Sequence, residues 1–443
     1  MLNYLPPKSL QFEEYLTELY PGYINGVADI KTLTFQVTEN CCLNCSYCYQ
    51  KHTTNKDMKF ETIQPFLDKL LTDNFEAIST KNTKGLIWEF IGGEPFMQID
   101  LIEQITDYVF EYMIRNNHPW LFYSRIAFSS NGILYSTEKV QSYLNKYEGF
   151  ISLGISIDGN KQLHDTCRVD LTGQGSYDRV ISAIRQYKST HNGHPPQAKL
   201  TFAHENIPYL YDAFISLIDE GYTELPGNCV YEDVWDDNDP AILYNQLKKL
   251  ADYIIDNDLY DKIHITFFEE DFFQPMDEKD DRNWCGGVGS FMYAVDYEGN
   301  LYHCIRYMES SLQGEQDPLI IGDIEHGVGK LPQHAKNEEL TNNVTRRSQS
   351  TDECFYCPVA QGCAWCSGFN YQKTGSVNKR VTYICKMHKA RGLANVYYWN
   401  KLYHKLNIPK SKHNYLPTTD CLKIISTSEL QLLKQMEESN YGM

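Results

Sequence analysis

The stretch FQVTENCCLNCSYCYQ, from Phe35 to Gln50, decides the fold because a β-rich run ends directly in spaced cysteines. Cys41, Cys45 and Cys48 follow the pattern Cys-x-x-x-Cys-x-x-Cys. A [4Fe–4S] cluster has four irons and normally takes four cysteine thiolates. Three thiolates leave one iron open to a ligand from outside the protein. A zinc site remains the alternative for cysteines this close together.

Short β-rich runs alternate with amphipathic helical patterns between Leu33 and Asp256, which is typical of a parallel α/β fold. One helical pattern repeats apolar residues on a single face, at Leu101, Ile102, Ile105, Val109 and Met113. Six candidate strands begin at Leu33, Gly85, Arg125, Ile151, Ala198 and Asn228. Six βα units are too few for a closed eight-unit barrel. Because sites in such folds lie at the carboxyl ends of strands, Cys41 stands where a site is expected.

Three further motifs follow the second, third and fourth candidate strands. They are Gly92-Gly93-Glu94-Pro95, Ser129-Ser130-Asn131-Gly132, and Ser156-Ile157-Asp158-Gly159 with His164, Asp165 and Arg168 after it. Glycines allow close backbone approach and unusual dihedral angles. A Gly-Gly-Glu-Pro run is by itself a common turn, but its place after a strand and downstream of the cysteines favours a binding loop. His164 is interpreted as a structural hydrogen-bonding residue.

The three-cysteine motif and these loops resemble the radical S-adenosylmethionine (radical SAM) enzymes. The resemblance implies a partial (β/α)6 TIM barrel in which Cys41, Cys45 and Cys48 hold a radical-generating [4Fe–4S] cluster. That cluster would cleave S-adenosylmethionine to a 5′-deoxyadenosyl radical, which abstracts hydrogen from an unactivated carbon. The resemblance also implies cofactor contacts from Tyr47, Gly92, Gly93, Glu94, Pro95, Ser129, Asn131, Ser156, Asp158 and Arg168. Tyr47 would lie against the adenine, and Ser156 with Arg168 would hold the methionyl carboxylate.

A second group of cysteines lies beyond Pro275, where the strand and helix alternation stops. Its spacing resembles the seven-cysteine SPASM module, which binds two auxiliary [4Fe–4S] clusters. The resemblance implies one fully ligated cluster held by Cys354, Cys357, Cys363 and Cys385. It implies a second held by Cys285, Cys304 and Cys366, for which we hypothesise an open iron. The module usually has three residues between Cys363 and Cys366, where this chain has two. A pair of zinc sites remains the alternative.

Four cysteines are left over, and we predict small buried side chains for them: Cys42, Cys167, Cys229 and Cys421. The chain as a whole resembles SPASM-type peptide maturases, and residues 362–367 most resemble those acting on Cys-x-x-x repeat peptides. An open auxiliary iron would bind and deprotonate a substrate cysteine, since metal coordination removes the thiol proton. We therefore hypothesise thioether crosslinking of a ribosomally made, cysteine-rich precursor peptide. A flavodoxin or ferredoxin is the implied electron donor.

Two other readings stay open. One is a different radical oxidation, either formylglycine formation or carbon–carbon crosslinking. Sulfatase-maturating enzymes place an Asp directly after the cysteine equivalent to Cys304, whereas this chain has Ile305 followed by Arg306. The other reading is an electron carrier or sensor without catalysis, which would need no loops for S-adenosylmethionine.

Composition bears on the partners of the protein, its location and the role of its cysteines. The formal net charge of −18 argues against a nucleic-acid partner. The N-terminal MLNYLPPKSL has no apolar run, so we predict neither a signal peptide nor a membrane span. Fourteen cysteines without an export signal indicate metal ligands in a reducing cytoplasm. We expect an N-terminal extension, a radical SAM barrel, a SPASM domain, and a C-terminal helix with tail, over residues 1–32, 33–260, 261–388 and 389–443.

Overall fold

The computed structural model describes residues 30–52, 55–270, 274–276, 279, 285–289, 291–363, 365–408 and 416–441. All fourteen cysteines lie within these ranges. The predicted N-terminal extension, 1–32, lies outside the described residues up to position 29. No helix in the described part of the chain is long and apolar enough to cross a lipid bilayer.

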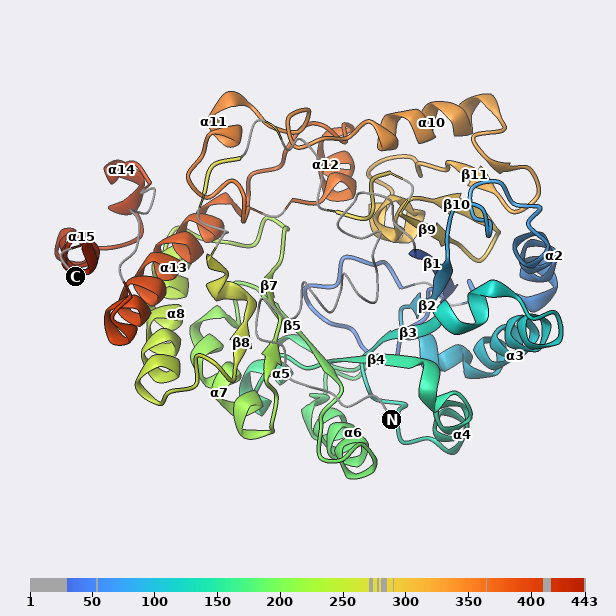
Figure 1. The fold of residues 1–443 in the computed structure, drawn as a ribbon, viewed down its shortest axis with the longest axis horizontal. Coiled ribbons are helices and arrows are strands. Elements are labelled where there is room, and N and C mark those ends of the chain that lie inside the picture. Colours follow the sequence, from blue (N-terminus) through green and yellow to red (C-terminus); the bar gives the residue numbers. More distant parts are fainter. Residues whose placement is uncertain are drawn as a thin grey trace.

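The larger of the two sheets in the described residues has ten strands, and the six strands at one end of its order are parallel to one another (Figure 1). These six are β1 (Ile30–Thr38), β2 (Gly85–Gly92), β3 (Arg125–Ser130), β4 (Ile151–Ser156), β5 (Gln197–Phe202) and β7 (Gly227–Cys229). Each coincides with a candidate strand of the sequence, and their spatial order follows their order in the chain. The predicted open, partial barrel of six βα units is therefore confirmed.

Helices cover the outer face of this barrel (Figure 1). They are α2 (Phe60–Leu71), α3 (Ile99–Arg115), α4 (Glu138–Lys146), α5 (Lys161–Cys167), α6 (Tyr177–Thr190), α7 (Leu210–Asp219) and α8 (Asp239–Asp256). The five apolar residues predicted to share one face of α3 are all buried. On the sheet side, the rings of Phe35, Phe90 and Phe128 stack across β1, β2 and β3 with centroids 5.6 and 5.7 Å apart. Aromatic residues facing one another across strands supply much of the apolar area of such a core.

The C-terminal region continues the same sheet. Strand β9 (Met292–Val295) pairs in parallel with β1, from Thr32 opposite Met292 to Phe35 opposite Val295. Strands β10 (Asn300–Tyr302), β11 (Gly322–Asp323) and β12 (Gly327–Val328) then extend the sheet in antiparallel fashion. The sequence did not predict this extension. It places the segment of Cys304 next to β1, the strand that leads into the loop with Cys41.

The remaining elements are shorter or lie at the C-terminus. Among them, α13 (Cys385–Leu406) lies beside α8 (Figure 1), and Tyr244 and Lys248 of α8 both hydrogen-bond Glu429 of α15. The others are β6 (Glu224–Leu225), β8 (His264–Ile265), α9 (Glu309–Leu312), α10 (Pro332–Asn342), α11 (Asp352–Phe355), α12 (Ser367–Thr374), α14 (Thr418–Cys421) and α15 (Thr427–Tyr441). Single 3-10 turns lie at Pro95–Gln98, Pro119–Tyr123, Glu148–Phe150, Ile207–Tyr209, Thr266–Phe268 and Ile305–Tyr307.

Two phenylalanines offer a matched test of this core. The side chain of Phe35 is 0% exposed, whereas that of Phe122 is 82% exposed. Replacing Phe35 with alanine should lower the free energy of unfolding by about 3–5 kcal/mol, because it removes a ring from a packed stack. Phe122→Ala should change it by less than about 0.5 kcal/mol. Urea unfolding followed by circular dichroism measures both, and equal effects would contradict the assigned core.

Candidate functional site

The loop that leaves β1 carries the three cysteines of the first motif. Cys41 is buried, and Cys45 and Cys48 are partly buried. The loop is fixed at several points: Leu43 N–H donates to Cys41 Sγ at 3.4 Å, and Cys48 N–H donates to the Cys45 carbonyl at 3.0 Å. Asn44 N–H and Ser46 N–H donate to the carbonyls of Val169 and Cys167 at 2.8 and 3.0 Å. The loop that carries the three thiols is therefore fixed at the carboxyl end of the first parallel strand.

The spacing of the thiols bears on the metal they would hold. In the described part of the chain, no three cysteine sulfurs lie within 4.8 Å of one another. Tetrahedral zinc with Zn–S bonds of about 2.3 Å would bring its thiolates to about 3.8 Å. The thiols therefore stand too far apart for a preformed single-ion zinc site.

The Gly-Gly-Glu-Pro turn packs directly on the cysteine loop. Gly93 N–H donates to the Thr38 carbonyl at 3.1 Å, and Glu94 N–H donates to the Asn40 carbonyl at 2.9 Å. A Cβ atom on Gly93 would lie 2.3 Å from the Asn40 carbonyl oxygen and 2.8 Å from the Cβ of Cys41. The chain therefore needs glycine here so that its own backbone can approach the cysteine loop.

Glu94 joins the loops after β2 and β3. Its side chain is fully buried and accepts hydrogen bonds from Phe96 N–H at 3.1 Å, Ser130 Oγ at 2.8 Å and Asn131 N–H at 2.7 Å. Burial raises the pKa of Glu94 to about 7. The predicted cofactor acceptor thus directs its oxygens to the protein, while Pro95 begins a short 3-10 turn beside it. Its role is to fix the loops around the site.

The loop after β3 reaches the cysteines from the other side. Asn131 Nδ2 lies 3.3 Å from Cys42 Sγ and 3.7 Å from Cys41 Sγ. Ser129, two residues earlier, is only partly buried and accepts a hydrogen bond from Lys199 Nζ at 3.1 Å. The loop therefore supports the cysteine loop through Asn131, while Ser129 lies on the opposite, inner face of β3.

A buried ion pair fixes the aromatic residue of the first motif. Arg168 donates from Nε and Nη2 to the two carboxylate oxygens of Asp158, at 2.8 and 3.2 Å. The Tyr47 hydroxyl donates to the same carboxylate, and Thr201 N–H donates to it at 2.9 Å. The guanidinium of Arg168 lies 5.3 Å from the centroid of the Tyr47 ring. The structure thus brings together Tyr47, Asp158 and Arg168, three of the predicted cofactor contacts. Two of the guanidinium nitrogens of Arg168, Nε and Nη2, are already bound to Asp158.

His164 uses both ring nitrogens inside the protein. Asp158 N–H donates to Nδ1 at 3.3 Å, and Nε2 lies 2.9 Å from Ser176 Oγ. Because Ser176 Oγ donates to the Arg168 carbonyl at 2.8 Å, the protonated nitrogen is Nε2. Burial lowers the pKa of His164 to about 4. His164 therefore stands neutral behind the Asp158–Arg168 pair.

Three of the C-terminal cysteines meet beside β10. A Cβ on Gly287 would lie 3.3 Å from Cys304 Sγ and 3.5 Å from Cys285 Sγ, so this glycine packs against both thiols. Cys366 caps the start of α12, where its Sγ accepts from Phe369 N–H at 3.4 Å. Burial and then the nearby Cys366 raise the pKa of Cys285 to about 11 and of Cys304 to about 12. These are the three thiols for which the sequence suggested one open position.

The other four C-terminal cysteines line one pocket, to which Cys366 also contributes: Cys354, Cys357, Cys363 and Cys385. Three lining residues bring buried donors that have no partner among the described residues, namely Trp365 Nε1, Asn370 Nδ2 and Arg380 Nε. A buried donor left without an acceptor costs about 1–3 kcal/mol. Acceptor sulfurs of a cluster held by the four thiolates would satisfy such donors. The lining of this pocket therefore fits an iron–sulfur cluster.

A contact between Arg306 and Tyr49 joins the two cysteine regions. Arg306 follows Cys304 by two residues, and its guanidinium lies 3.6 Å from the centroid of the Tyr49 ring. Tyr49 follows Cys48 directly. Glu232 accepts from both terminal nitrogens of Arg306 at 3.2 and 3.3 Å. The guanidinium is therefore held between the first cysteine loop and the loop after β7.

Backbone contacts extend this junction into α9. Lys51 N–H donates to the Ser310 carbonyl at 2.7 Å, and Gln313 Nε2 donates to the Tyr49 carbonyl at 2.8 Å. Gln36 of β1 also donates to Ser310 Oγ at 2.9 Å. The segment after Cys304 is thus fixed on the loop that carries Cys48. Sequence reasoning missed this junction because Gln36, Tyr49 and Lys51 lie more than 250 positions from their partners in the C-terminal segment and share no motif with them.

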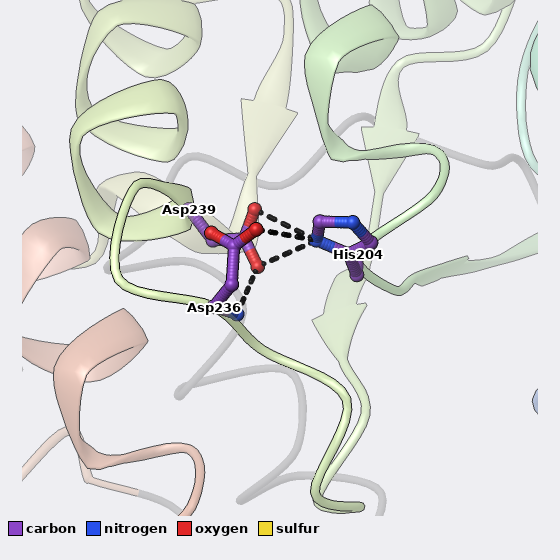
Figure 2. A group of neighbouring side chains, drawn as sticks. All are labelled: His204, Asp236 and Asp239. Carbon is purple, nitrogen blue, oxygen red and sulfur yellow. Dashed lines mark hydrogen bonds and ion pairs between the residues drawn. The ribbon is translucent and has the colours of Figure 1, made fainter.

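A second unpredicted group lies at the far edge of the barrel. His204 Nδ1 lies 2.9 Å from Asp239 Oδ2 and 3.7 Å from Asp236 Oδ2 (Figure 2). Asp239 is buried at the start of α8 and also accepts from Asp236 N–H at 2.8 Å. The hydrogen bond from Asp239 raises the pKa of His204. The group ties the loop after β5 to the loop after β7.

Comparison with known proteins places the first half of this site in a family. Residues 35–192 match the Radical SAM superfamily. This part of the chain is a radical SAM domain. It contains the first three cysteines and all of the predicted cofactor loops.

Two sequence relatives match only part of the chain, whereas a solved structure matches most of it. An uncharacterized protein of Methanocaldococcus jannaschii is 32% identical over 185 residues, which are 42% of this chain and 57% of that protein. A cysteine-type anaerobic sulfatase-maturating enzyme of Clostridium novyi is 28% identical over 160 residues, 35% of this chain and 40% of that enzyme. The chain thus spans about half the length of these relatives. The solved structure of native anSMEcpe with bound AdoMet has a TM-score of 0.61 at 17% identity, covering 85% of this chain and 99% of that one. That likeness shows a common fold.

Gly93 and Gly149 allow a matched test of the loop packing. Gly93→Ala should displace the cysteine loop and lower the iron bound after anaerobic reconstitution several-fold, because its Cβ would meet the Asn40 carbonyl. Gly149→Ala should bind as much iron as the wild type, since nothing lies within 4 Å of its Cβ position. Iron analysis and absorbance measure both. Full iron binding by Gly93→Ala would contradict the assigned packing.

His164 should contribute to the pH dependence of stability. The unfolded chain protonates this histidine near pH 6.5, while burial holds the native pKa at about 4. Unfolding therefore takes up a proton in this window, and stability falls as the pH drops from 6.5 towards 4. The slope attributable to His164 approaches about 1.4 kcal/mol per pH unit.

The variant His164→Gln removes this titration. Its free energy of unfolding should fall less steeply than that of the wild type between pH 6.5 and 5, even though it is less stable overall. Urea unfolding at several pH values gives the two slopes. Parallel slopes would show that His164 does not titrate differently in the native and unfolded chains.

Proposed function

We propose that this protein is a radical SAM enzyme that oxidises a cysteine-containing peptide and closes a thioether crosslink. The observation that carries the proposal is the Arg306–Tyr49 contact, which joins a loop with three thiols to a second group with three thiols. A three-thiolate cluster keeps one iron open to an outside ligand. The Arg306–Tyr49 contact holds the two three-thiol sites next to each other. One site could then bind the cofactor and the other a substrate thiol.

The residues divide into three cluster sets under this proposal. Cys41, Cys45 and Cys48 would hold the cluster that binds S-adenosylmethionine. Two auxiliary clusters would be held by Cys354, Cys357, Cys363 with Cys385, and by Cys285, Cys304 with Cys366. When bound, the first cluster and S-adenosylmethionine supply an electron and a carbon radical that abstracts hydrogen.

The protein's own part is to bind, orient and exclude water. Tyr47 would lie against the adenine, with its hydroxyl held by Asp158. The inner face of the sheet carries Ser129 and Ser156, which would face the cofactor. Gly92, Gly93 and Pro95 shape the turn that Glu94 fixes in place. Closing a thioether would pass one hydrogen atom from carbon to the 5′-deoxyadenosyl radical, release the thiol proton, and pass one electron to an auxiliary cluster, so each crosslink makes the peptide two hydrogens lighter.

The partners follow from this chemistry. The substrate would be a ribosomally made, cysteine-rich precursor peptide, and the electron donor a flavodoxin or ferredoxin in the cytoplasm. The solved structure of anSMEcpe with AdoMet and a Cp18Cys peptide supports a peptide in this fold. The division into a barrel over 33–260 and a SPASM domain over 261–388 belongs to the same proposal, with the C-terminal helix and tail after it.

Formylglycine formation is the second candidate, because a sulfatase-maturating enzyme is among the relatives. Against it, Ile305 stands where those enzymes place an Asp, and the side chain that reaches the junction is Arg306, a cation unsuited to act as a base. Carbon–carbon crosslinking remains a further form of the same radical chemistry. The three products differ in mass and in their free thiols.

Three cysteine variants test the proposal. Cys366→Ala should lose crosslinking by at least about 100-fold and keep reductive cleavage of S-adenosylmethionine, because only the auxiliary cluster with the open iron loses a ligand. Cys45→Ala should lose both activities. Cys421→Ala should lose neither, since this buried thiol belongs to no cluster set.

The assay is mass spectrometry of a cysteine-rich peptide co-expressed anaerobically and then alkylated, with chromatography of 5′-deoxyadenosine. A peptide lighter by two hydrogens per blocked cysteine supports thioether formation. Loss of sulfur with gain of an aldehyde would instead establish formylglycine chemistry. Normal crosslinking by Cys366→Ala would contradict the proposed open position.

A further inference from the structure

Lys199 is a basic residue on the inner face of the barrel that no motif singled out. On β5 the side chains alternate, so that Ala198, Leu200 and Phe202 are buried outward while Lys199 points to the inner face. In the sheet register, Lys199 stands opposite Ser156 of β4. Its amine reaches across β4 to donate to Ser129 Oγ of β3 at 3.1 Å.

The shape of β4 makes this reach possible. Gly154 lies opposite Ser129 on one side and Gln197 on the other, and it carries no side chain on the inner face. The amine of Lys199 therefore passes the position of Gly154 to reach Ser129, and Ser156 is the strand partner of Lys199 itself. An ammonium group has three donors, and Ser129 accepts one of them.

The arginines near Lys199 have carboxylate partners, whereas Lys199 itself has none among the described residues. Three arginines near the cysteine loop each hold a carboxylate: Arg168 with Asp158 at 2.8 Å, Arg179 with Asp170 at 3.0 Å, and Arg306 with Glu232 at 3.2 Å. Lys199 makes no ion pair with any described residue. Glu89, the carboxylate on the inner face of β2, already accepts from Thr34 Oγ1 at 2.5 Å. The Lys199 side chain is exposed on this inner face, and the surrounding barrel atoms together with the nearby Arg168 lower its pKa.

We propose that Lys199 binds a carboxylate inside the barrel, with the hydroxyls of Ser129 and Ser156 beside it. The inference rests on the proposed function, because it takes the inner face of β3, β4 and β5 as the cofactor and substrate cavity. Two molecules there carry a carboxylate, namely the methionyl part of S-adenosylmethionine and an acidic side chain of the peptide. In either case the charge comes from Lys199, because Arg168 is already occupied by Asp158.

The first test measures binding rather than turnover. The reconstituted full-length protein, Lys199→Met, Lys199→Arg and the surface control Lys139→Met are compared in anaerobic equilibrium dialysis without reductant. The two probes are S-adenosylmethionine and its decarboxylated analogue. If the methionyl carboxylate is the ligand, the wild type should prefer S-adenosylmethionine by about tenfold or more. Lys199→Met should lose this preference, and Lys199→Arg and Lys139→Met should keep it.

The second arm tests the peptide carboxylate. Two cysteine-containing peptides that differ only by Glu against Gln are compared for binding to the same four proteins. If the peptide is the source, the wild type should bind the Glu peptide about tenfold more tightly, and Lys199→Met should bind both equally. Support in either arm identifies the source.

One result would overturn the inference. If Lys199→Met matches Lys139→Met with all four probes, at unchanged iron content, then Lys199 binds no carboxylate. This outcome is separate from a failure of the proposed function, which would appear as a wild-type protein that neither cleaves S-adenosylmethionine nor modifies a peptide.

Discussion

The buried carboxylate of Glu94 links the loops that surround the first cysteine motif. Its backbone N–H holds the Asn40 carbonyl, while its side chain accepts from Ser130 and Asn131. Asn131 in turn touches the sulfurs of Cys41 and Cys42. A buried carboxylate is costly unless its oxygens are paired, so the three loops must fold together or not at all. These contacts fix the loop that carries the three thiols.

The pairing of β9 with β1 sets the second constraint. A C-terminal segment that joins the barrel sheet in parallel register places Cys304 beside the strand that leads to Cys41. The Arg306–Tyr49 stack and the contacts of Ser310 and Gln313 then fix the two cysteine regions against one another. Chemistry that passes between a radical and a bound thiol needs such fixed geometry, since small misplacements of reacting groups are costly. The inner face that lies between them carries Lys199.

Sequence reasoning found what local patterns encode. The six parallel strands, the buried face of α3 and the cysteine groups follow from alternation, helical spacing and short motifs. The sequence motif identified Gly92 and Gly93 but not why position 93 requires glycine. Only the fold shows that a side chain on Gly93 would collide with the Asn40 carbonyl. Sequence reasoning also expected Arg168 to hold the methionyl carboxylate of the cofactor. In the structure, the guanidinium of Arg168 binds the carboxylate of Asp158, ten positions earlier in the chain. Lys199, Arg306 and the His204 group were missed because each depends on partners distant in sequence, and no local pattern reports which charges meet in space.

The central claim is that Cys41, Cys45 and Cys48 hold a cluster whose fourth iron takes S-adenosylmethionine. The most direct measurement is electron paramagnetic resonance of the reduced, reconstituted protein with and without S-adenosylmethionine. Added S-adenosylmethionine should shift one cluster signal. This signal and its shift should both be missing in Cys48→Ala, while the signals of the C-terminal clusters remain. A spectrum that is unchanged by S-adenosylmethionine in the wild-type protein would contradict the claim.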